Sequence, residues 1–120
     1  MKTIIVGSSP NHERYSYQTA TLLRHFGHEF IPLGIKNGSV LGLAIQNIRQ
    51  FPAIDKPHTI TLYIRPELQE QYYDYLLGLK PQRIIFNPGT ENLEFEQMVT
   101  KHGILAIEAC TLVMLRTGQY

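Results

Sequence analysis

A chain of 120 residues that is 43% hydrophobic is long enough for one domain, residues 1–120, around a single core. Its net charge of +1 is spread over interspersed acids and bases, which argues against a nucleic-acid partner, and its apolar runs are too short to cross a membrane. The single cysteine excludes an intramolecular disulfide and suits a reducing cytoplasm.

Five apolar, β-branched segments predict strands that are covered on both faces. The first belongs to the N-terminal stretch MKTIIVG, which no small-residue cleavage site follows, so we interpret it as a strand and not as a signal peptide. The five segments are Thr3–Val6, Glu29–Leu33, Thr59–Ile64, Arg83–Asn87 and Ile104–Ile107.

Segments with helical periodicity separate these strands. The first runs from Tyr15 to Phe26 and has Gly27 at its C-terminal stop position. The second has the same apolar spacing from Leu68 to Leu79, and Pro66 suits its first position. The remaining helices are expected at residues 95–102, at 111–115 and, as one or two turns stopped by Pro52, at 44–48.

Alternation of strands and helices indicates βαβ units with right-handed crossovers. We therefore predict an α/β fold, a five-stranded, doubly wound parallel sheet with helices on both faces. Such sheets bind ligands beyond the carboxyl ends of their strands, where the strand order reverses.

The residues that follow the predicted strands are rich in glycine, hydroxyl groups and cations. Backbone N–H groups at a helix start, together with the helix dipole, stabilise phosphate, and arginine and lysine add charge. Singly, each residue has an ordinary explanation as a turn or a solvated loop. Together at one edge they favour a phosphate-bearing ligand. The residues are Gly7, Ser8, Ser9, Pro10, Arg14, Lys36, Arg65, Pro66, Asn87 and Cys110.

The sequence disfavours NAD as that ligand. A dinucleotide fingerprint needs G-x-G-x-x-G after the first strand, and only Gly7 is present. The acid that would bind the NAD ribose is replaced by Leu33 and Gly34. Lys36 suits an additional ribose phosphate, which leaves NADP or coenzyme A. A phosphoacceptor receiver domain is excluded because Gly7 and Arg65 stand where it needs acids.

Five blocks of the sequence resemble the small stand-alone coenzyme A-binding protein family. They are VGSSPNHERYSYQTATLL, IPLGIK, LYIRP, IIFNPGTEN and EACTLVML, and they cover nearly the whole chain in the family's order. The Rossmann-like domain of that family is related to the coenzyme A-binding domain of the succinyl-CoA synthetase α subunit. The first block, with its Ser-Pro-Asn and a hydroxyl–aromatic pair before the helix, is the most specific.

The resemblance implies roles for individual residues. Gly7, Ser8 and Ser9 would contact the pyrophosphate, Ser16 and Tyr17 would lie beside it, and Lys36 would be a phosphate partner. Leu33-Gly34-Ile35 depart from the family pattern, and so does Asn87, which stands where glutamine is frequent. Arg65-Pro66 and Cys110 match family residues.

No nucleophile with a base and no metal-ligand spacing is evident, and His12 is the one histidine in the proposed binding loop. We therefore expect no catalytic residues and no metal, but non-catalytic binding of coenzyme A or a short acyl-CoA. Cys110 could exchange with the coenzyme's thiol or be a buried small hydrophobe. The alternatives are an NADP-binding or redox module, and an interaction subunit with a vestigial pocket. Tyr72, Tyr73 and Tyr75 motivate the latter and leave a homodimer or a protein partner open.

Overall fold

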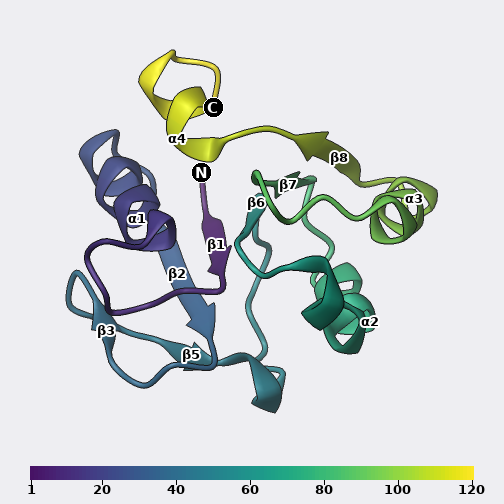
Figure 1. Ribbon diagram of the computed structural model, residues 1–120, viewed down its shortest axis with the longest axis horizontal. Coiled ribbons are helices and arrows are strands. Elements are labelled where there is room, and N and C mark those ends of the chain that lie inside the picture. The colour runs from purple at the N-terminus through teal and green to yellow at the C-terminus, as the bar shows by residue number, and fades with distance from the viewer.

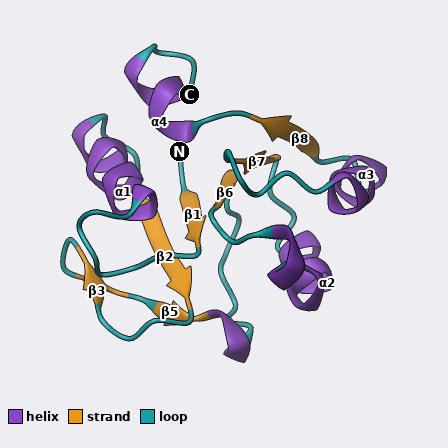
Figure 2. Ribbon diagram, viewed as in Figure 1, coloured by secondary structure: helices purple, strands orange, loops and turns teal.

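The computed structural model describes residues 1–120, with strands, helices and short 3₁₀ turns arranged as Figures 1 and 2 show. The strands are β1 Thr3–Val6, β2 Phe30–Gly34, β3 Ser39–Val40, β4 Leu43–Ala44, β5 Gln46–Asn47, β6 Thr59–Leu62, β7 Arg83–Phe86 and β8 Leu105–Glu108. The α-helices are α1 Tyr15–His25, α2 Tyr73–Gly78, α3 Leu93–Lys101 and α4 Thr111–Arg116. The 3₁₀ turns are η1 Ile48–Gln50, η2 Pro66–Leu68 and η3 Glu70–Tyr72. None of the helices has the length and apolar character needed to span a membrane.

Six strands form the main sheet in the order β5-β2-β1-β6-β7-β8, and every neighbouring pair is parallel. Counted along the chain, this is the order 3-2-1-4-5-6 of Rossmann folds. All five predicted strands are present, but the five-strand count was wrong because β5 adds a sixth. The strand is only two polar residues long, Gln46 and Asn47, which pair with Leu33 and Gly34.

The expectation of helical turns around Ala44 to Ile48 was also wrong. Leu41 and Gly42 both have positive φ, which makes the tight turn between β3 and β4, and the chain then stays extended through β5. Helical structure begins only at η1, where Asn47 Oδ1 accepts a hydrogen bond from the Arg49 amide at 2.9 Å.

The second predicted helix is divided into η2, η3 and α2. Pro66 does stand at its start, but Tyr72 leaves the helical region with φ −112° and ψ 2°. The Gln69 side chain points inward and donates hydrogen bonds to the carbonyls of Ile64 and Thr90, which belong to two different loops. These bonds constrain the path of the segment.

Two hydrophobic clusters contact the sheet, and the residues of β1 alternate between them. Ile4 and Val6 belong to a cluster with core residues of α2 and α3, including Leu76 and Phe95. Ile5 belongs to a cluster that includes Ala20 and Leu23 of α1 and Leu115 of α4. Side chains along a strand point alternately to opposite faces, so the two clusters lie on opposite faces of the sheet. The helices α1 and α4 pack beside one another (Figure 1).

The strand order reverses between β1 and β6. From β1 the chain continues to β2 and β5 on one side, and it returns to β6, β7 and β8 on the other. The turn after β1, which begins at Gly7, therefore stands where open α/β sheets bind their ligands.

Candidate functional site

A cleft of about 750 Å³ opens beyond the carboxyl ends of β1, β2 and β6. This volume is in the range of small-molecule sites. Its walls come from the turn after β1, the start of α1, the segment after β2, η1, the segment from Tyr63 to Tyr72 and the loop after β7. The charged residues that line it are Glu13, Arg14, Lys36, Arg49 and Arg65.

The turn after β1 is fastened to β2. Gly7 has φ +93°, and the amides of Gly7 and Ser8 both donate to the Leu33 carbonyl, at 2.9 and 3.1 Å. The backbones approach so closely that a Cβ on Gly34 would lie 2.9 Å from the Ser8 carbonyl oxygen. The Ser8 hydroxyl donates to the Ile5 carbonyl at 2.8 Å. Gly7 and Ser8 therefore use their donors within the fold and shape the floor of the cleft.

The start of α1 is open toward the cleft. The helix begins at Tyr15 with no side-chain cap and no acid in its first turn. The amides of Tyr15 and Ser16 have no hydrogen-bond partner in the chain, and both residues line the cleft. Ser9 Oγ accepts from the Asn11 amide at 3.1 Å, so its hydroxyl proton stays available. These groups form the positive, donor-rich end of a helix dipole.

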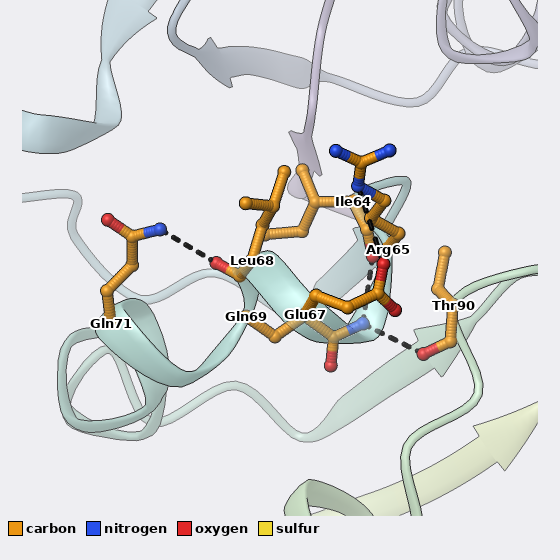
Figure 3. Close-up of polar contacts among 7 residues, drawn as sticks. All are labelled: Ile64, Arg65, Glu67, Leu68, Gln69, Gln71 and Thr90. Atoms are coloured by element: carbon orange, nitrogen blue, oxygen red, sulfur yellow. Dashed lines mark hydrogen bonds and ion pairs between the residues drawn. The ribbon is translucent and has the colours of Figure 1, made fainter.

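The cations of the cleft are largely unpaired. Arg65 forms the chain's only side-chain ion pair, with Glu67 at 3.5 Å, and both side chains are about 70% exposed (Figure 3). A pair so exposed contributes little stability and leaves Arg65 available to another anion. Arg14, Lys36 and Arg49 have no ion-pair partner, so the cleft carries excess positive charge.

Seven of the residues predicted from sequence line this cleft. They are Gly7, Ser8, Ser9, Arg14, Ser16, Lys36 and Arg65. Pro10, Tyr17, Pro66, Asn87 and Cys110 are outside its lining. Tyr17 stacks on His12 with ring centroids 4.3 Å apart and packs against the Ile5 cluster.

Asn87 holds the carboxyl edge of the sheet together. Its side chain is buried, donates to Thr61 Oγ1 at 2.8 Å and the Leu62 carbonyl at 2.9 Å, and accepts from the Thr111 amide at 2.9 Å. The Asn87 side chain, which is shorter than the glutamine frequent at this position in the family, thus connects β6 with the start of α4. Cys110, half-buried, is the residue before α4.

Sequence reasoning missed two parts of the cleft. One is Arg49, in a segment whose structure was predicted wrongly. The other is an apolar wall formed by Ile48, Ile64, Leu68 and Tyr72. The local sequence signal was Asn47, a favourable N-cap residue directly before the short helical turn that contains Arg49.

Gln69 connects the two loops on the β6 side of the cleft. It is fully buried, and its Nε2 donates to the carbonyls of Ile64 and Thr90, both at 2.8 Å (Figure 3). Its Oε1 accepts from Asn92 Nδ2 at 2.9 Å, and Asn92 in turn caps α3 by accepting from the Phe95 amide. Ile64 and Thr90 both line the cleft, so one amide fixes both loops.

Glu96 extends this network toward solvent, where its Oε2 accepts from the Asn92 amide at 2.9 Å. Burial and the neighbouring carboxylates of Glu108 and Glu91 raise the pKa of Glu96 above its usual 4.5. The folded protein therefore holds this proton more tightly than the unfolded chain does, and its stability falls as the pH rises through the raised pKa.

We expect Glu96→Gln to remove that fall, because the glutamine oxygen still accepts from Asn92 without carrying charge. Urea unfolding midpoints measured between about pH 4 and 7 test this, with the exposed Glu29→Gln as the control. Identical pH profiles for Glu96→Gln and the unsubstituted protein would contradict it.

Comparison with known proteins adds to this geometry. The family model described as a CoA binding domain matches residues 1–116. The chain belongs to the CoA-binding domain family. This membership supports coenzyme A as the general class of ligand, and it agrees with the resemblance seen in the sequence. A search of curated proteins finds no match.

Solved structures share the fold of this family member. An uncharacterized protein solved by crystallography is 50% identical, with 99% of this chain and 97% of that chain covered and a TM-score of 0.96. A hypothetical protein from Pyrococcus horikoshii OT3 is 22% identical, with coverage of 96% and 81% and a TM-score of 0.83. A protein from Thermus thermophilus is 18% identical, with coverage of 99% and 90% and a TM-score of 0.84. The last two likenesses concern the fold alone.

Proposed function

We propose that this protein binds coenzyme A, or a short acyl-CoA, without transforming it. The observation that carries the proposal is the open N-terminus of α1, whose unpartnered Tyr15 and Ser16 amides face a cleft with excess positive charge. An anionic diphosphate fits such a site because the amides and the dipole both favour negative charge. The family match over residues 1–116 supports coenzyme A as the source of that diphosphate.

Each part of the site has a proposed role. The diphosphate would accept hydrogen bonds from the Tyr15 and Ser16 amides and the Ser9 hydroxyl, with Arg14 adding charge. Gly7, Ser8 and Pro10 would shape the turn beneath it, and Tyr17 would support the helix from behind. The proposed contacts toward the rest of the coenzyme are Lys36 and Arg65, whereas Pro66, Asn87 and Cys110, which lie outside the cleft lining, would support the loops around it.

The composition of the cleft supports binding without conversion. Its lining contains one carboxylate, Glu13, and its other titratable groups are cations and tyrosines. We propose that residues 1–120 act as one cytoplasmic domain serving as a carrier, sensor or accessory subunit. The single free cysteine supports a reducing setting.

NADP is the second candidate ligand. The 3-2-1-4-5-6 strand order and the cations Lys36 and Arg49 beyond β2 and β5 favour it. Calorimetric titration with coenzyme A, dephospho-coenzyme A, NADP and NAD in parallel separates the candidates. Binding of coenzyme A supports the proposal, and binding of NADP alone would replace it with the second candidate. If none of the four ligands binds, both candidates are excluded.

An acid at the start of α1 should compete with the phosphates. Tyr15 is 68% exposed, so Tyr15→Asp is accommodated, and the carboxylate stabilises the helix start by about 0.3–1 kcal/mol. The same charge repels the diphosphate, so we expect roughly tenfold weaker coenzyme A binding in calorimetry, a loss of about 1.4 kcal/mol. Tyr15→Asn is the neutral control for the lost ring. Equal affinity of the two variants would show that no anion binds at this helix start.

A further inference from the structure

We propose that Arg49 determines the ligand specificity of this cleft by binding, together with Lys36, a phosphate group on the adenosine ribose. The inference rests on the proposed function and concerns a part of the ligand other than the diphosphate. Sequence reasoning did not single out Arg49, because helical turns were expected at residues 44–48, before it.

The sheet register brings the two cations together. In the parallel pair of β2 and β5, Gly34 is the partner of Asn47, and Lys36 and Arg49 each stand two residues further along. Neighbouring strands are about 4.8 Å apart, so the two residues follow adjacent strand ends at the same edge of the sheet. Both are exposed, and both line the cleft.

The charges of this pair are not balanced by the protein. No carboxylate lies within ion-pair distance of either residue, and Glu13, the one acid of the cleft lining, comes from the loop before α1. Two adjacent cations repel one another, and an anion that binds between them removes the repulsion. Arginine offers a planar fork to phosphate oxygens and lysine a point charge, a combination suited to a phosphate monoester.

The backbone of Arg49 is held in place, so the residue is more than a cation on a free loop. Ile48 is buried in the core at 2% exposure, and Asn47 Oδ1 accepts from the Arg49 amide at 2.9 Å. The side chain therefore starts from a fixed point at the rim of the cleft. A preorganised start reduces the entropy that is lost when the side chain binds a ligand.

The spacing also fits a ligand with two phosphate groups. The turn beneath the α1 start follows β1, whereas Lys36 and Arg49 follow the strands one and two positions away. At about 4.8 Å per strand, the second anion position lies roughly 5–10 Å from the first. In coenzyme A a single ribose joins the diphosphate to the ribose phosphate, so one ligand can reach both positions.

A thermodynamic cycle tests the inference. Coenzyme A and dephospho-coenzyme A are titrated by calorimetry against the unsubstituted protein and against Arg49→Gln. We expect Arg49→Gln to weaken coenzyme A binding roughly tenfold and to leave dephospho-coenzyme A binding unchanged, because the lost bond needs the phosphate. Arg49→Lys should retain part of the preference for coenzyme A over dephospho-coenzyme A. Arg116→Gln, on α4 outside the cleft, controls for the change in net charge.

The failures are distinguishable. If the unsubstituted protein binds both ligands equally, the inference is wrong while the proposed function stands. An equal loss for both ligands in Arg49→Gln would assign Arg49 a structural role and also overturn the inference. If neither ligand binds the unsubstituted protein, the proposed function fails and the inference fails with it.

Discussion

Replacing Gly7 by alanine is expected to lower the free energy of unfolding by about 3 kcal/mol and to weaken coenzyme A binding at least roughly tenfold. Two costs add at this position. The φ of +93° is strained for any residue with a side chain, and a Cβ would lie 3.0 Å from the Tyr63 carbonyl carbon and 3.1 Å from its oxygen. These are backbone atoms beside β6, so the turn itself must move. Ser8, Ser9 and the start of α1 then move with it.

Gly89 supplies the matched control. It has the same φ of +93°, but a Cβ there would meet nothing within 4 Å. Gly89→Ala therefore carries the backbone strain without the close contact, and the two variants should differ by about 1–3 kcal/mol in urea unfolding. Equal destabilisation would show that the close approach of the turn to β6 is not a constraint, and the proposed shape of the cleft floor would have to be revised.

The strands could be predicted because their signal is local. Thr3–Val6 is apolar and β-branched throughout, and the structure has β1 at those residues. The start of α1 at Tyr15 was predictable for the same reason, since one apolar stripe and Gly27 define the helix. The parallel α/β sheet follows from the alternation of elements and the handedness of their crossovers, but its strand order is seen only in the structure.

The sixth strand and Arg49 could not be predicted in this way. Gln46 and Asn47 have no strand pattern of their own, and they are extended because Leu33 and Gly34 offer them a sheet edge. The role of Asn87 could not be predicted from the sequence for a different reason. It does follow a strand at the carboxyl edge, but the Thr111 amide and β6 use its hydrogen-bonding groups, a tertiary contact that sequence spacing does not reveal.

Gln69→Leu is expected to lower the free energy of unfolding by about 3 kcal/mol and the melting temperature by roughly 10 °C. The side chain is fully buried, and leucine fills its place without a polar atom. The carbonyls of Ile64 and Thr90 and one proton of Asn92 Nδ2 then lose their partner. Because both carbonyls belong to loops that line the cleft, we also expect roughly tenfold weaker coenzyme A binding.

Gln71→Leu is the control for this change, since the Gln71 side chain is exposed and bonds the Leu68 carbonyl at 3.1 Å (Figure 3). It should alter stability by less than about 0.5 kcal/mol. Gln69→Glu separates hydrogen bonding from packing, because it keeps the shape and the acceptor for Asn92 but turns a carboxylate oxygen toward the two carbonyls. That variant should be destabilised at neutral pH and should recover in part at acidic pH, where its protonated oxygen donates again. A Gln69→Leu protein as stable as the unsubstituted one would contradict the role of this amide in holding the two loops of the cleft.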